Sequence, residues 1–100
     1  MIMLNITTKV AHPIVPEWLK WHEEFWKTAI HDTGLVLETH TYKLLEHDDE
    51  DGQTFVAQLK MASEKEYDTF MEEFDELLRR RTHQRFGTNV ISFRTLMKSI

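Results

Sequence analysis

His22 stands in a stretch rich in aromatic residues, with Trp18 four residues before it and Trp26 four residues after it. Residues four apart lie on one face of an α-helix, so two indole rings would flank the imidazole. A histidine in these surroundings could line a ligand pocket, act as a general base or coordinate haem iron. The alternative is a histidine at the edge of the core with a single hydrogen-bond partner.

Polar residues on two predicted strands form a second group of candidates. Asn5 alternates with apolar neighbours, so it would point to the other side of its strand from Leu4. It would be either a polar strand end or a hydrogen-bonding group in a dimer interface. Glu38, His40 and Tyr42 share one strand face and could transfer protons as an acid–base pair with a phenol. The alternative for this row is a partly exposed edge strand.

Arginines continue the apolar stripe of the second predicted helix. Arg81 and Arg85 follow Leu78 on this line, where leucine or alanine would be typical. An arginine stem can cover apolar surface while its guanidinium reaches a carboxylate. The alternative is an anion pocket that these residues form with Arg94. The run of arginines at 79–81 also complements the dipole at the end of the helix.

Several common functional motifs are absent from the chain. The acidic segment Glu46–Asp51 lacks the ligand spacing, central glycine and terminal glutamate of an EF-hand, so it indicates a solvated hairpin tip. The chain has no HExxH motif, no Gly-rich phosphate loop, no G-x-S-x-G motif and no cysteine. These absences argue against zinc proteases, nucleotide-binding proteins and common hydrolases. No metal site and no cofactor is implied.

The length, composition and charge of the chain limit the class of protein it can be. A chain of 100 residues with 41% hydrophobic residues is expected to form one domain, residues 1–100. The net charge of −5 argues against nucleic acid as a partner. The first ten residues lack the features of a signal peptide, and no apolar run is long enough to span a membrane. We therefore expect a cytoplasmic protein with no membrane partner.

Hydrophobic periodicity predicts the elements that position the candidates. Alternating residues indicate strands over 2–10, 35–46, 54–61 and 89–97. A first helix is expected from Pro16 to Gly34, and a second from a capping box at Ser63 and Glu66 to Phe86. The apolar face of the first helix would hold Trp18, Leu19, His22, Phe25, Trp26, Ala29 and Ile30. That of the second would hold Tyr67, Phe70, Met71, Phe74, Leu77 and Leu78.

The order β-α-β-β-α-β predicts an α+β fold of the ferredoxin-like type. Right-handed crossovers give a four-stranded antiparallel sheet with both helices on one face. The other face would then be bare, yet strands one, three and four carry apolar residues on both sides. Such a surface favours a homodimer that pairs two sheets face to face; the alternative is a monomer with small exposed patches. The opposed apolar pairs are Met3 and Leu4, Val56 and Phe55, and Phe93 with Val90 and Leu96.

Short motifs along nearly the whole chain carry a family resemblance. They are N-I-T at 5–7, E-W-L-x-W at 17–21, T-G at 33–34, E-D-G at 50–52, R-F-G at 85–87 and F-R-T at 93–95. With these motifs the chain resembles a family of short bacterial proteins of unknown function in the dimeric α+β barrel superfamily. The resemblance implies a ferredoxin-like fold that dimerises through its sheets. It implies no activity.

One segment departs from the family pattern. The family carries Met and then His-hydrophobic-Pro in the first helix, whereas this chain has His22 and then Trp26-Lys27-Thr28. A role of the family histidine is therefore not transferred to position 26. The wider superfamily includes quinol-type and haem-degrading monooxygenases, isomerases and chlorite-dismutase-like haem proteins, with pockets between helices and sheet. Some of these monooxygenases hold substrate or oxygen with an asparagine on the first strand, which points to Asn5.

Together these observations predict a homodimeric small-molecule-binding or structural module. Its ligand would be a small hydrophobic or anionic molecule in an aromatic-lined hollow between the first helix and the sheet. The alternatives are an oxygenase-type enzyme, either cofactor-independent or haem-dependent, and a purely structural dimer with its helices packed shut. The candidate pocket residues are Asn5, Trp18, His22, Trp26, His40, Tyr42, Arg81 and Arg85.

Overall fold

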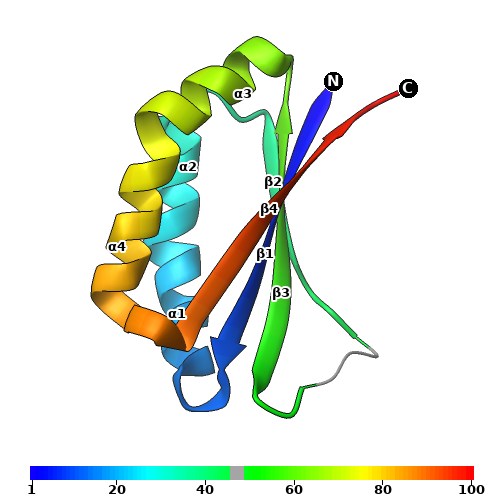
Figure 1. Ribbon diagram of the computed structural model, residues 1–100. Coiled ribbons are helices and arrows are strands. Elements are labelled where there is room, and N and C mark those ends of the chain that lie inside the picture. The colour runs from blue at the N-terminus through cyan, green and yellow to red at the C-terminus, as the bar shows by residue number, and fades with distance from the viewer. Residues whose placement is uncertain (46–48) are drawn as a thin grey trace.

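The computed structural model describes residues 1–45 and 49–100, and it has the element order β-α-β-β-α-β (Figure 1). The strands form one antiparallel sheet in the order β2-β3-β1-β4, and the helices all lie against one face of it (Figure 1). The strands are β1 (Ile2–Ala11), β2 (Glu38–Lys43), β3 (Gly52–Met61) and β4 (Val90–Lys98). This arrangement confirms the predicted ferredoxin-like α+β fold.

The hairpin of β2 and β3 differs in length from the prediction. β2 is shorter than the expected strand 35–46, although Leu37 N–H and Leu44 N–H still donate to carbonyls of β3 at its two ends. The predicted acidic tip at 46–51 lies partly outside the described residues. β3 begins at Gly52, where a Cβ would lie 2.4 Å from the carbonyl oxygen of Val10. The missing side chain therefore lets β3 begin this close to β1.

The first helix runs without a break through three segments. It consists of α1 (Val15–Trp21), a π-helical turn (His22–Trp26) and α2 (Lys27–Asp32). The N–H of Lys27 donates to the carbonyl of His22, five residues earlier, which is the hydrogen bond that defines a π-helix. Gly34, at φ 72°, follows the last turn and confirms the predicted glycine at the helix end.

The second helix has the same three-part construction. It consists of α3 (Glu64–Phe70), a π-helical turn (Met71–Asp75) and α4 (Glu76–Phe86). The Ser63 hydroxyl accepts the N–H of Lys65 at 3.3 Å and also hydrogen bonds the Glu66 carboxylate, which confirms the predicted capping box. Each long helix thus contains one π-helical turn near its middle.

The π-helical turn changes which residues of the first helix are buried. An α-helix advances about 100° per residue, so residues four apart drift by about 40° at each step. The extra residue of a π-turn offsets that drift, and Trp18, His22, Trp26 and Ile30 all remain buried. The prediction that Leu19 and Phe25 belong to the buried face was wrong, because these side chains are 42% and 36% exposed.

The same offset changes the second helix. From the last residue of its π-turn onward, the residues that face the sheet are Asp75, Leu78, Thr82 and Phe86. Leu77 was predicted to be buried and is exposed instead. Arg81 and Arg85 were predicted to continue the apolar stripe, and they too are exposed. The inserted residue rotates this line away from the sheet.

The core between helices and sheet consists of two apolar clusters. The larger one includes Leu4, Leu59, Ile30 and Phe70, and the smaller one is centred on Trp18 and Phe55.

No helix in the described part of the chain is long and apolar enough to cross a bilayer.

The sheet face remote from the helices is mixed in character. Its apolar side chains include Phe93 and Ile91 on β4, which are 62% and 64% exposed, and Tyr42 on β2. On the central strands of this face, the polar residues Asn5 and Gln58 lie opposite each other in the strand register. The predicted apolar surface is therefore concentrated toward the sheet edges.

Candidate functional site: a cavity between the helices and the sheet

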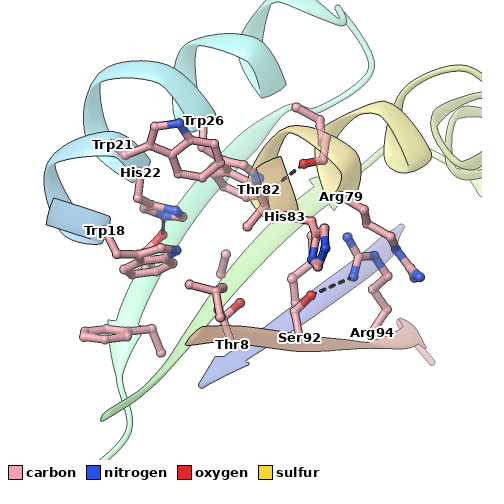
Figure 2. Close-up of a pocket in the computed structure, with 16 residues that line it drawn as sticks. Thr8, Trp18, Trp21, His22, Trp26, Arg79, Thr82, His83, Ser92 and Arg94 are labelled. Carbon is pink, nitrogen blue, oxygen red and sulfur yellow. Dashed lines mark hydrogen bonds between the residues drawn. The ribbon is translucent and has the colours of Figure 1, made fainter. Parts of the chain in front are cut away.

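A cavity of about 220 Å³ lies where the two apolar clusters meet. Both helices and all four strands contribute to its wall (Figure 2). Its apolar wall is formed by side chains from both clusters. These are Ile6, Trp18, Trp26, Phe55, Ala57 and Leu78.

One wall of the cavity is a stack of rings that contains His22. The imidazole lies between Trp18 and Trp26, at centroid distances of 4.6 and 4.5 Å and interplanar angles of 24° and 15°. Trp18 stacks in turn on Phe55 at 4.9 Å. The four-residue spacing of Trp18, His22 and Trp26, together with the π-turn, places all three side chains on the cavity wall (Figure 2).

His22 is buried and neutral at pH 7. Its Nε2 atom lies 2.7 Å from Oγ1 of Thr41 on β2, so the Thr41 hydroxyl satisfies one ring nitrogen. Burial lowers the pKa of His22 to about 4; the positive charge of Lys27 adds to this effect, and Glu23 opposes it. The neutral ring can therefore form hydrogen bonds inside the protein without placing a charge in the core.

The opposite end of the cavity carries charged groups. The Arg94 Nε atom donates to Asp75 Oδ1 at 2.7 Å, and Arg79 Nε lies 2.9 Å from Asp75 Oδ2. The side chains of Asp75 and Arg94 are 5% and 12% exposed, whereas Arg79 reaches the surface. Burial lowers the pKa of Arg94 below its usual value, and Asp75 opposes this shift; the guanidinium stays charged.

The mouth of the cavity is polar. Arg94 Nη1 donates to the Ser92 hydroxyl at 3.2 Å. Figure 2 shows Arg79 and His83 of α4 beside Ser92 and Arg94 of β4. The cavity therefore has an aromatic end under the first helix and a cationic end between α4 and β4.

Three of the predicted site residues lie on the other side of the sheet. Asn5, His40 and Tyr42 alternate with residues that face the helices, so they do not line the cavity. His40 lies 3.6 Å from Glu38, which also pairs with Lys60 at 3.2 Å. These contacts match the edge-strand alternative, and β2 is an edge strand.

Arg81 and Arg85 lie outside the cavity, along a shallow groove with Trp21 and Phe25. The Arg81 guanidinium lies 6.0 Å from the centroid of Phe25, and Arg85 lies 3.6 Å from Glu17. The hypothesis that these arginines form an anion pocket with Arg94 does not match this arrangement. Arg94 pairs with Asp75, and Arg79 takes the place expected for Arg81.

Sequence reasoning missed Thr41, Asp75 and His83 as site residues. The strand alternation that predicted Tyr42 on one face places Thr41 on the other, but it does not identify which face meets the helices. Asp75 joins the buried line only because of the π-turn. His83 is exposed on α4 and contributes to the cavity mouth.

The described residues do not fit a metal ion or a haem. Within 1–45 and 49–100 no group of three or more His, Cys, Asp or Glu side chains could hold a metal ion. Pockets for drug-sized ligands measure about 300–1,000 Å³, and this cavity of about 220 Å³ is too small for a porphyrin. The Nε2 atom of His22 is also already bonded to Thr41.

The fold and the cavity define this chain as a ferredoxin-like α+β protein with a cavity between its helices and its sheet. The chain belongs to the family described as a domain of unknown function, DUF4286, whose family model matches residues 1–100. No protein with a curated description matches the sequence.

Solved structures share the fold at very low sequence identity. HapK from Hahella chejuensis matches with a TM-score of 0.75 and 10% identity, covering 100% of this chain and 93% of that one. A dimeric ferredoxin-like protein from an uncultured marine organism matches at 0.66 and 6%, covering 99% and 94%. An ethyl tert-butyl ether (EthD) family protein from Bacillus halodurans matches at 0.62 and 5%, covering 98% and 99%. At these identities the similarity extends to the fold alone.

Proposed function

We propose that this protein is a small-molecule-binding module whose ligand occupies the cavity between the helices and the sheet. The observation that carries the proposal is the buried ring stack of Trp18, His22 and Trp26 beside open space. A core built only for stability would fill this volume with aliphatic side chains, because buried polar groups and voids both cost free energy. Pockets that bind ligands combine apolar walls with a few convergent polar groups, as this one does.

The properties of His22 favour binding over proton transfer. A general base is most effective when its pKa lies near the working pH, and the pKa of His22 is lowered to about 4. As a neutral ring between two indoles, His22 instead fixes the aromatic wall and lines the cavity with its polar edge. We therefore assign it a recognition role, in preference to the oxygenase alternative.

The proposed working unit is a homodimer formed through the sheet face remote from the helices. Phe93, Ile91 and Tyr42 are large side chains exposed on that face. One structural neighbour is described as a dimeric ferredoxin-like protein. A second copy would remove these side chains from water and would leave the cavity, on the other side of the sheet, accessible.

The binding proposal is tested by NMR titration of the full chain with a library of small aromatic fragments. The indole N–H signals of Trp18 and Trp26 report on the cavity wall. The matched control is Ala57→Leu, because Ala57 lines the cavity floor and a larger side chain there reduces the free volume. We expect fragments that shift both indole signals in the wild type and lose their effect in the variant. Failure of every fragment to bind, or equal shifts in Ala57→Leu, would contradict the proposal.

A further inference from the structure

We infer that the ligand of this cavity is a small aromatic monoanion, such as an aromatic carboxylate, with its charged group at Arg79 and Arg94 and its ring at the tryptophan end. The inference rests on the proposed binding function and specifies the class of ligand. It follows from the charges and donors at one end of the cavity, the aromatic lining of the other end and the cavity volume.

The charges at the cationic end do not balance. Asp75 supplies one negative charge, and Arg94 and Arg79 each supply a positive charge within hydrogen-bonding distance of it. The cluster therefore retains one net positive charge beside a partly enclosed space. The surplus charge lies on Arg79, which reaches the surface at the cavity mouth, and an anion bound there would pair with it. One surplus charge matches a monoanion better than a doubly charged phosphate.

The guanidinium of Arg94 retains hydrogen-bonding capacity. An arginine has five N–H donors, and within the described residues the hydrogen bonds of Arg94 use Nε toward Asp75 and Nη1 toward Ser92. This leaves Nη2 for another acceptor. The planar guanidinium suits a carboxylate, because both groups can form parallel hydrogen bonds. Asp75 holds Arg94 in position, so little side-chain entropy would be lost on binding.

The other end of the cavity suits a flat apolar group. Trp18, Trp26 and Phe55 present aromatic surface there, with Ile6 and Ala57 on the sheet. A cavity of about 220 Å³ is smaller than the roughly 300–1,000 Å³ of pockets for drug-sized ligands, so it suits about one ring with a short substituent. Hydrophobic burial of the ring and charge pairing of the carboxylate would therefore act at opposite ends.

Three probes of similar shape test the sign of the charge. Benzoate, benzyl alcohol and benzylammonium are titrated separately into the full chain, with tryptophan fluorescence and indole N–H shifts as readouts. We expect benzoate to bind about tenfold more tightly than benzyl alcohol, as one charge-assisted hydrogen bond would give. Benzylammonium is expected not to bind.

Two arginine variants locate the charge effect. Arg79→Gln removes the surface-reaching guanidinium of the cluster while Arg94 keeps its bond to Asp75. Arg80→Gln is the matched control, because Arg80 is a similarly exposed neighbour that pairs with Glu76 and does not line the cavity. Arg79→Gln should abolish the preference for benzoate, and Arg80→Gln should preserve it.

The outcomes separate this inference from the proposed function. If benzyl alcohol binds as tightly as benzoate and Ala57→Leu abolishes both, the monoanion inference is overturned and the binding function stands. Equal loss of benzoate binding in Arg79→Gln and Arg80→Gln would show general surface attraction and would also overturn it. If none of the probes binds, the inference fails, and the fragment titration decides the binding function.

Discussion

The Nε2 atom of His22 lies 2.7 Å from the Oγ1 atom of Thr41, and this contact joins the π-helical turn of the first helix to edge strand β2. The imidazole is thereby fixed in the plane that stacks on Trp18 and Trp26. Without the π-turn, the four-residue spacing would drift around the helix and move Trp26 off this line. The π-turn thus keeps Trp26 in the ring stack, and the contact with Thr41 fixes the orientation of His22 within it.

Protonation of His22 is expected to destabilise the fold. The pKa of this histidine is 6.5 in the unfolded chain and about 4 in the folded protein, so the unfolded chain binds more protons between these values. Above about pH 6.5 His22 is neutral in both states and does not lower the free energy of unfolding. As the pH falls from 6.5 toward 4, protonation of the unfolded chain lowers the free energy of unfolding. The loss amounts to about 3 kcal/mol.

Urea denaturation at pH 7, 5.5 and 4 measures this effect. His22→Gln should show a smaller fall in unfolding free energy over the same range, because glutamine does not titrate. His31→Gln is the control, since His31 is exposed on α2. Equal pH profiles for wild type and His22→Gln would contradict the prediction.

Loss of the Thr41 hydroxyl should leave a buried ring nitrogen unpaired. Thr41→Val keeps the shape of the side chain and removes the hydrogen-bonding group, so we expect a loss of about 1–3 kcal/mol in unfolding free energy. Thr39→Val, two residues earlier on the same strand face, should change stability much less. If both variants unfold at the same urea concentration as the wild type, the His22–Thr41 bond contributes nothing to stability.

The order of elements and the alternation of residues along most strands could be predicted because their signals are local, but not which strand face meets the helices. Alternation over β1 and β3, the capping box at Ser63 and the glycine at position 34 each depend on neighbouring residues. Trp18, His22 and Trp26 were selected because their spacing places them on one face of any helix. These features need no knowledge of what packs against them.

The cationic end of the cavity could not be predicted in the same way. A π-turn adds one residue without a local signal, and it exchanges the exposed and buried positions that follow. Arg81 was expected to line the cavity, but Arg79 and Thr82 line it instead. The pairing of Arg79 with Asp75 was not expected. Thr41 and Arg94 belong to opposite edge strands, so only the assembled sheet brings them to one cavity.

Removal of Asp75 should destabilise the protein strongly. Asp75→Ala leaves Arg94 buried without its partner, for which a loss of about 3–5 kcal/mol is expected. Arg79→Gln removes only the exposed partner of Asp75, which keeps its bond to Arg94, and should cost less than about 1 kcal/mol. Urea denaturation at neutral pH compares the two. A smaller loss for Asp75→Ala than for Arg79→Gln would contradict the buried pair as described.

The far face of the sheet should hold two copies together in solution. Sedimentation of the wild type is expected to give twice the chain mass of 12.0 kDa at micromolar concentration. Phe93→Glu places a charge among side chains that the partner would cover, so this variant should sediment as a monomer. Leu77→Glu is the matched control, because Leu77 is an exposed apolar residue on α4, on the helical side, and this variant should remain a dimer. A monomeric wild type, or dissociation by both variants alike, would rule out pairing through this face.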